Sequence, residues 1–259
     1  MAVRTEHIDK WVRAYFDGVT IVDCREPLLF WEADFPVPGY AFPRRDVRTD
    51  LLRDARSEPP REPSFFSPKG PVLRWYDLTV NGRIVPNAAW VRDTPELSNL
   101  LVLSWQPGVL DLWLEEEEPV ASHPRDPHKR VEAITSSRHV VVERNGVRLA
   151  ESRRPVLLFE TTLPTRYYLP REDVNTAVLA ATTNHSHCPY KGIADQYWSV
   201  VGQPDASNVA WSYSAPLPAV AKVAGLVAFY NEVVDISVDG VLQQRPESPF
   251  SLESNRPTS

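Results

Sequence analysis

The spacing of apolar and polar positions predicts strands rather than long helices. Residues 139–150 form two alternating segments around the turn dipeptide Asn145-Gly146, which predicts a β-hairpin. Asp17-Gly18 has the corresponding place near the beginning of the chain. Further strands are predicted where β-branched and aromatic residues gather, at 155–160, 196–201, 209–213, 226–230 and 233–238.

One short helix is expected in each half of the chain. Asp173 follows Pro170, and its carboxylate can accept hydrogen bonds from the free backbone N–H groups of a helix start. Residues 174–181 are good helix formers, and Asp46 has the same place in the first half. The 25 prolines favour short elements separated by turns. The expected fold class is therefore mainly β, with one short helix per half.

The two halves are diverged copies of one sequence. Residues 16–47 match residues 144–174 after one inserted residue in the first segment. The coinciding pairs are Gly18 and Gly146, Pro27 and Pro155, Glu32 and Glu160, Pro36 and Pro164, Tyr40 and Tyr167, Pro43 and Pro170, and Asp46 and Asp173. Chance similarity would not keep so many prolines in step, so we predict two domains in tandem.

Composition marks the boundary between the copies. The acidic residues 115–118 lead into a segment that is rich in proline and charge and poor in core-forming residues. We therefore predict a first repeat at 1–118, a linker at 119–135 and a second repeat at 136–241. Residues 242–259 lack periodicity and are predicted to be a disordered tail.

Length and charge narrow the possible classes. The 259 residues suffice for two domains of ordinary size. The net charge is −6 and the basic residues are scattered, so nucleic acid is not an expected partner. No stretch reaches the roughly 18 apolar residues of a membrane span, and the amino terminus has no signal-peptide pattern. We expect a cytoplasmic protein without a membrane partner, and predict no oligomeric state.

The two cysteines lie in different halves of the chain. Neither a disulfide framework nor a paired-cysteine zinc site is therefore expected within one domain. Cys24 aligns with Ser152 and is most simply a packing residue. Cys188 belongs to the densest polar cluster, residues 183–192, and stands three residues before Lys191.

This cluster permits two interpretations of Cys188. The positive charge of Lys191 favours the ionised, nucleophilic form of a thiol. Alternatively, Cys188 is a small buried apolar residue at the entrance of a strand. His185 and His187 could join it as metal ligands, but three donors so close in sequence rarely converge on one ion. No metal and no cofactor is expected.

The second copy resembles the family called domain of unknown function 427. The resemblance spans about 138–240 and is carried by Asn145-Gly146, Glu160, Tyr167-Tyr168-x-Pro170, Asp173, Cys188-Pro-Tyr-Lys-Gly192, Ala210-Trp211-x-Tyr213, Pro216, Gly225 and Phe229. Residues of about 11–114 resemble the same family more faintly, as in its tandem members. The resemblance implies two tandem β-tent-like domains of antiparallel sheets, here without the paired cysteines that hold zinc in other β-tent proteins. Members have been labelled nucleotidyltransferase-like, but the family has no secure activity.

The family pattern also implies a cleft in the second copy. When the pattern is carried over residue by residue, the residues that border this cleft are Glu160, Tyr168, Cys188, Tyr190, Lys191, Trp211 and Tyr213. Aromatic faces would hold a flat ligand, and Arg166 beside the tyrosines could clamp an acidic group. The alternative is that Trp211 and Tyr213 pack in the core while Lys191 pairs with Glu160 or Asp195.

The first copy departs from this pattern. Ser67 stands near the cysteine position, Ala41 replaces the second tyrosine, and Arg92 has the place of Tyr213. Its site is therefore expected to be lost or altered. The residues that remain are Glu32, Lys69 and Trp90.

Three functions compete. The second repeat could bind a small polar or aromatic metabolite, with ligand-binding residues Arg166, Tyr168, Tyr190, Trp211 and Tyr213. It could instead be an enzyme in which Cys188 attacks an electrophilic carbon or sulfur, assisted by Lys191, while Glu160 or Tyr168 moves a proton. The third interpretation is a protein-interaction module without a cleft.

Overall fold

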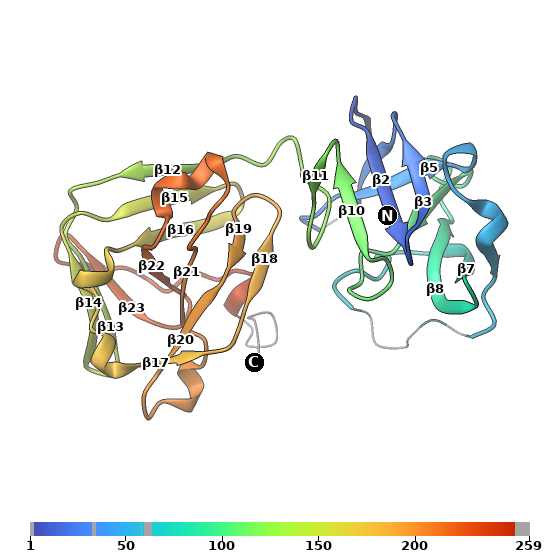
Figure 1. Ribbon diagram of the computed structural model, residues 1–259. Coiled ribbons are helices and arrows are strands. Elements are labelled where there is room, and N and C mark those ends of the chain that lie inside the picture. Colours follow the sequence, from blue (N-terminus) through green and yellow to red (C-terminus); the bar gives the residue numbers. More distant parts are fainter. Residues whose placement is uncertain (1–2, 33–34, 58, 60–63, 252–259) are drawn as a thin grey trace. The chain divides into compact units, whose positions relative to one another are not determined.

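The computed structural model describes residues 3–32, 35–57, 59 and 64–251 (Figure 1). The chain divides into two compact units, Met1–Asp126 and Pro127–Ser259. Each unit is described by itself below. Strands dominate both, and the described residues contain 3-10 turns but no α-helix. The mainly β fold class is thereby confirmed. No helix in the described part of the chain is long and apolar enough to cross a membrane.

The first unit contains two antiparallel sheets. Seven strands form the larger sheet in the order β1-β4-β5-β9-β8-β7-β6. Their bounds are Val3–His7 (β1), Leu28–Glu32 (β4), Gly39–Pro43 (β5), Leu52–Asp54 (β6), Val72–Val80 (β7), Arg83–Arg92 (β8) and Leu100–Leu103 (β9). The smaller sheet has the order β11-β10-β2-β3, with bounds Val12–Phe16 (β2), Val19–Cys24 (β3), Leu112–Glu115 (β10) and Glu118–Pro119 (β11).

The second unit repeats this order. Its strands run β12-β15-β16 and β22-β21-β20-β17, joined by a bridge between Leu169 and Val227. The bounds are Val131–Thr135 (β12), Val156–Glu160 (β15), Leu163–Tyr168 (β16), Leu179–Thr182 (β17), Gln196–Val200 (β20), Ala210–Ser212 (β21) and Val227–Phe229 (β22). The second sheet has the order β14-β13-β23-β24, with bounds Val140–Arg144 (β13), Val147–Ser152 (β14), Asp235–Val238 (β23) and Val241–Leu242 (β24). A separate hairpin joins β18 (Ser186–Cys188) to β19 (Gly192–Ala194).

The residue pairing is also repeated. Glu32 lies opposite Val3 in the first unit, and Glu160 lies opposite Val131 in the second. The larger sheets of the two units thus share both their strand order and this residue pairing, which supports the predicted duplication. In each unit the two sheets share one hydrophobic core, which is the arrangement that the β-tent resemblance implies. In the second unit this core includes Tyr168, Trp211 and Tyr213, which belong to the predicted site.

The predicted hairpins form, because their turn residues adopt the required conformation. Asn145 and Gly146 have φ values of 48° and 76°, and Asp17 and Gly18 have 49° and 74°. Two successive positive φ values match the twist of a two-residue hairpin, and asparagine, aspartate and glycine tolerate them best. The strands predicted at 155–160, 196–201, 209–213, 226–230 and 233–238 correspond to β15, β20, β21, β22 and β23.

The expected short helices take a different form. Two 3-10 turns, Arg171–Asp173 and Thr176–Val178, stand where the second helix was predicted, and Arg44–Asp46 and Thr49–Leu51 stand in the first copy. Residues 179–181, expected to be helical, belong to β17. Val174 is extended and bridges to Ala150, which interrupts any helix there. The Asp173 carboxylate makes no cap and instead accepts a 2.7 Å hydrogen bond from Ser152 Oγ.

The linker and tail also differ from the expectation. Residues 131–135, predicted within the linker, form β12 and pair with β15 along its whole length. In the tail, β24 ends at Leu242, and Phe250 packs with a ring-centroid distance of 5.7 Å against Tyr230. The rest of the predicted disordered tail, 252–259, lies outside the described residues.

Candidate functional site

A buried ion-pair group lies where β15 ends. Glu160 accepts a hydrogen bond from Lys191 Nζ through Oε2, and its Oε1 lies 3.3 Å from Lys129 Nζ. The side chains of Glu160, Lys191 and Lys129 are 6%, 12% and 15% exposed. The predicted pairing of Lys191 with Glu160 therefore exists, and a second ammonium joins it. Sequence analysis missed Lys129, although it precedes by two residues the strand partner of Glu160.

Burial and charge act in opposite directions on this group. Burial alone would raise the pKa of Glu160, but the Lys191 and Lys129 ammonium groups outweigh it and hold that pKa below its usual value. Burial would lower the pKa of Lys191, but negative charge on Cys188, Glu160 and Tyr168 raises it. At neutral pH Glu160 is therefore ionised and Lys191 is protonated, so Lys191 cannot act there as a base or an amine nucleophile.

Cys188 lies near Lys191, Tyr168 and Tyr213. It ends β18, its carbonyl accepts from the backbone N–H of Lys191 at 3.3 Å, and its side chain is partly exposed. Burial is the main cause that raises the pKa of Tyr168 to about 12 and that of Tyr213 well above its usual value. Charge interaction with the nearby Cys188 acts on both in the same direction. The cysteine hairpin therefore lies close to Tyr168 and Tyr213.

Three aromatic members of the predicted set are core residues. Tyr168, Trp211 and Tyr213 are 0%, 6% and 4% exposed. Trp211 Nε1 donates a 3.1 Å hydrogen bond to Tyr168 Oη, and the two rings are perpendicular. These side chains therefore form the packed base beneath Cys188 and Lys191. Tyr190 is only partly buried, and Lys129 Nζ lies 5.7 Å from its ring centroid.

Arg166 has a protein partner. Its guanidinium donates to both carboxylate oxygens of Glu232, at 2.6 and 2.8 Å, and the two side chains are 7% and 1% exposed. A fork-shaped pair of this kind is among the stronger ionic contacts in proteins. The expected arginine clamp did not take this pair into account, because an acidic ligand would first have to displace Glu232. The partner lies 66 residues further along the chain, and no local pattern announces it.

The neighbouring polar residues have other partners. Asp195, an alternative partner for Lys191, accepts a 2.9 Å hydrogen bond from the backbone N–H of Ser214. His185 Nδ1 lies 2.8 Å from the carbonyl oxygen of Thr183. Within the described ranges, no group of three or more histidine, cysteine or acidic side chains is arranged to hold a metal ion.

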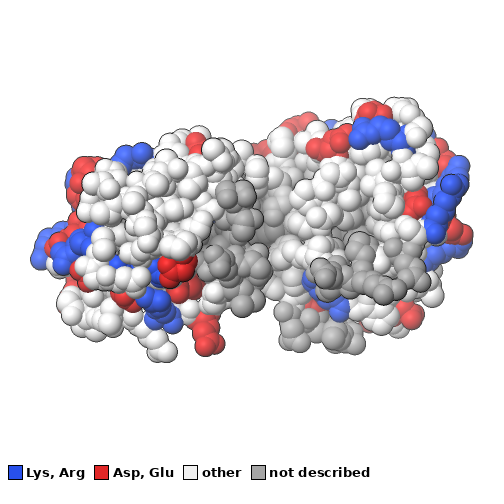
Figure 2. All heavy atoms as spheres, turned by 90° about the horizontal axis from the view of Figure 1, so that it is seen from below, with Lys and Arg blue, Asp and Glu red and all other residues white. Residues whose placement is uncertain are grey.

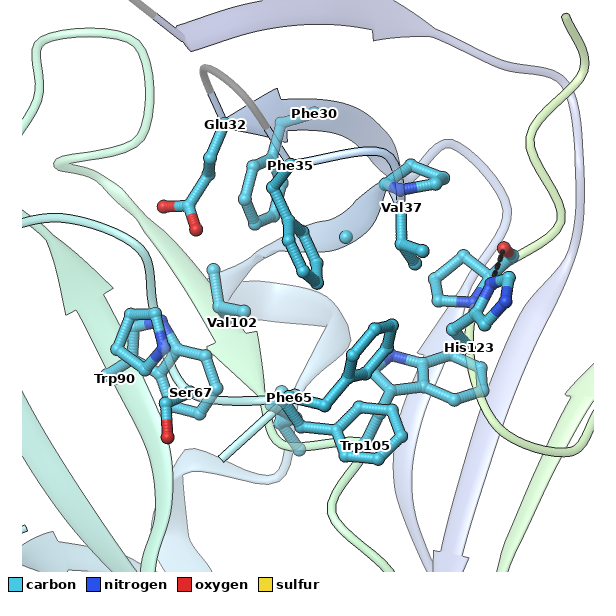
Figure 3. A pocket seen from close by; sticks show the side chains of 16 residues that line it. Phe30, Glu32, Phe35, Val37, Phe65, Ser67, Trp90, Val102, Trp105 and His123 are labelled. Atoms are coloured by element: carbon cyan, nitrogen blue, oxygen red, sulfur yellow. Dashed lines mark hydrogen bonds between the residues drawn. The ribbon is translucent and has the colours of Figure 1, made fainter. Parts of the chain in front are cut away.

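The first copy keeps the glutamate but changes its partner. Glu32 Oε1 lies 2.5 Å from Arg92 Nη2, and Oε2 accepts a 2.7 Å hydrogen bond from the Lys69 backbone N–H. The Lys69 ammonium instead donates to the carbonyl of Ser64 at 3.0 Å. Arg92, at the place of Tyr213, therefore replaces the lysine partner. An aromatic-lined hollow of about 60 Å³ lies beside this pair (Figure 3).

Surface charge is mixed in sign. Figure 2 shows basic and acidic side chains next to one another on the face that it displays. Exposed ion pairs also occur, such as Arg74 with Asp54 at 2.5 Å and Arg138 with Asp239 at 2.8 Å. Exposed pairs of this kind contribute little to stability. Compared with these exposed pairs, the buried Lys129–Glu160–Lys191 group is the more distinctive electrostatic feature.

Fold and site together define a duplicated antiparallel β domain with a buried glutamate–cation pair in each copy. A model of the family described as Domain of unknown function (DUF427) matches residues 4–102 and again residues 132–240. The chain belongs to this family, and the two matched segments correspond to the two copies. Comparison with curated proteins finds no match.

Proposed function

We propose that the second repeat binds a small anionic metabolite beside Cys188, at the Lys129–Glu160–Lys191 group. The observation that carries the proposal is that two ammonium groups share one carboxylate in a poorly hydrated place. The two ammonium groups and the one carboxylate together carry a net positive charge, and both lysine side chains are slightly more exposed than that of Glu160. Attraction between charges is stronger where water is partly excluded.

Aromatic surface complements this charge. The ring of Tyr190 lies beside Lys129 and is partly exposed, so it offers a face to a flat ligand. Cys188 stands next to Lys191 on the same hairpin and would contact the ligand at its other side. A small molecule with one carboxylate and an unsaturated or aromatic body matches these features.

Binding of benzoate, measured by isothermal titration calorimetry, tests this proposal. Benzoate and its neutral relative benzamide have the same shape, so only the charged probe should bind measurably to the wild type. Lys191→Met should weaken benzoate binding at least about tenfold, because one of two ammonium groups is lost. Lys69→Met, at the equivalent position of the first repeat, is the matched control and should leave it unchanged. Equal binding of both probes would contradict the proposal.

A second candidate is a cysteine-dependent enzyme, favoured by the partly exposed Cys188 thiol beside the Lys191 ammonium. In that mechanism the thiolate would attack an electrophilic centre, with Lys191 stabilising the developing negative charge. Tyr168, with its pKa raised to about 12 by burial, would keep its proton and could only donate it. Cys188→Ser should then leave the fold intact and abolish turnover.

Alkylation by iodoacetamide distinguishes the two candidates, because the protein contains an internal reference thiol. Cys24 is fully buried and donates to Asp46 Oδ2 at 3.3 Å, and burial raises its pKa to about 12. At pH about 7 it should stay unmodified in the folded protein, since the thiolate is the reactive form. Mass spectrometry should locate the label on Cys188. A rate no faster than that of free cysteine would argue against the enzyme and leave binding in place.

A further inference from the structure

Tyr213 is a buried side chain whose polar end has no partner among residues 3–32, 35–57, 59 and 64–251. It directly follows β21, and only 4% of its surface is exposed. Its hydroxyl forms no hydrogen bond within those ranges, whereas the hydroxyl of Tyr168 accepts one from Trp211 Nε1. The Tyr213 oxygen is not fully enclosed, unlike the neighbouring Ser212 Oγ, which is buried without a partner. A polar group of this kind is suited to a partner from outside the protein.

Comparison of the two repeats gives the direction of this side chain. Tyr213 has the position along the sheet that Arg92 has in the first repeat. There Arg92 Nη2 lies 2.5 Å from Glu32 Oε1. A side chain at this position therefore extends toward the glutamate, which in the second repeat is Glu160. The charge interaction of Tyr213 with Cys188 agrees with this direction, because Cys188 belongs to the hairpin whose turn contacts Glu160.

The Tyr213 hydroxyl is a neutral hydrogen-bond donor. Burial raises its pKa well above the usual value, and charge interactions with Tyr168 and Cys188 act in the same direction. At neutral pH the group therefore keeps its proton and carries no charge. Its O–H can donate to an oxygen of a ligand. Because a ligand carboxylate is attracted to the two ammonium groups, the hydroxyl is left for a second, uncharged oxygen of the same molecule.

We infer that the ligand of the second repeat is a 2-oxo carboxylate whose carbonyl oxygen accepts a hydrogen bond from Tyr213. The inference rests on the proposed function, because the carboxylate of the same molecule would lie at the Lys129–Glu160–Lys191 group. A carbonyl next to the carboxylate suits the short distance between Cys188 and Lys191, whose backbone groups form a 3.3 Å hydrogen bond across the hairpin turn. A ligand without the second oxygen would leave the hydroxyl without a partner, so the site would discriminate against it.

Benzoylformate and atropate test the inference on the full-length protein. The two anions have the same shape, but atropate has a methylene group in place of the carbonyl oxygen. In isothermal titration calorimetry benzoylformate should bind at least about fivefold more tightly, the contribution of about one hydrogen bond. Lys191→Met should weaken both probes by a similar factor, because both carry the same carboxylate.

The outcomes separate this inference from the proposed function. Equal affinities that both fall in Lys191→Met would overturn the inference and leave the proposed anion site in place. Binding of benzoate without binding of benzoylformate would have the same meaning. No binding of benzoate, benzoylformate or atropate would overturn both.

Tyr213→Phe tests the donor itself, because it removes only the hydroxyl. The affinities for the two probes should then lie within about twofold of each other. Tyr197→Phe is the matched control, since the Tyr197 hydroxyl already lies 2.5 Å from Ser186 Oγ, and it should keep the preference for benzoylformate. The preference should also persist in Cys188→Ser, which excludes a reaction of the carbonyl with the thiol as its cause. A preference that survives Tyr213→Phe, or that disappears in Cys188→Ser, would overturn the inference. The comparison of the two probes on the wild type remains decisive if Tyr213→Phe does not fold.

Discussion

At the scale of single residues, the two repeats show how one glutamate position keeps a cation by different means. Glu160 is held by Lys191 and Lys129, and Glu32 by Arg92. A buried carboxylate without a partner is costly, so loss of the lysine contact in the first repeat had to be matched by another cation. The arginine at the place of Tyr213 supplies it.

Glu160→Gln should destabilise the second repeat by about 3 kcal/mol, because it leaves the buried Lys191 ammonium without its anionic partner. Urea denaturation followed by circular dichroism measures the loss. Glu151→Gln is the control, since Glu151 forms an exposed pair with Arg148 and should cost far less. A loss as small as that of the control would mean that the buried pair contributes little.

Stability should also depend on Glu160 in mild acid. Its pKa is lower in the folded state than its ordinary value of 4.5, so the folded protein binds the proton less readily than the unfolded chain does. The contribution of ionised Glu160 to the free energy of unfolding is fully present at a pH above its ordinary pKa. This contribution is lost as the pH falls through the pKa of Glu160 in the folded state. The difference in unfolding free energy between wild type and Glu160→Gln should therefore shrink below pH about 4. A difference that stays constant down to pH about 2 would contradict the assignment.

At the scale of elements, turn chemistry proved more reliable than helix propensity. The Asn145-Gly146 dipeptide formed the predicted hairpin because its two positive φ values are a local requirement. Residues 174–181 are good helix formers, yet Val174 bridges to Ala150 and Leu179–Thr182 pairs with β20. Pairing with distant strands outweighed a local preference worth only a few tenths of a kcal/mol per residue.

Gly146→Ala should therefore destabilise the second repeat by about 1 kcal/mol, because alanine at a φ of 76° suffers a steric penalty that glycine avoids. Nothing crowds a Cβ atom at this position, so the penalty would come from the backbone alone. Asn145→Gly is the control, since glycine accepts the φ of 48° and should change the urea midpoint little. Equal midpoints for wild type and Gly146→Ala would count against the turn assignment.

At the scale of the whole molecule, each repeat contains everything that a β domain needs. One core cluster extends from Ala133 to Val238, and another from Val12 to Trp113. Among the described residues, every strand pairs with strands of its own unit. A domain with a complete core can fold by itself.

Residues 1–126 and 127–259, produced separately, should each unfold cooperatively in urea and give a β-type circular dichroism spectrum. Residues 1–99 are the control, because they lack β9, which lies between β5 and β8 in the larger sheet. This shorter fragment should show no cooperative transition. Failure of either complete repeat to fold would show that it depends on the other.

The sequence by itself determined the duplication and the strands, because repeated prolines, turn dipeptides and alternation act over a few residues. It left Glu160 and Asp195 as alternative partners of Lys191, and the structure shows the contact with Glu160. Only the tertiary structure decided that Lys129 joins Glu160, that Glu232 holds Arg166, and that the first repeat contains a hollow. Ion pairs and cavities arise between segments that folding brings together, here as far as 66 residues apart. Local patterns carry no record of such distances.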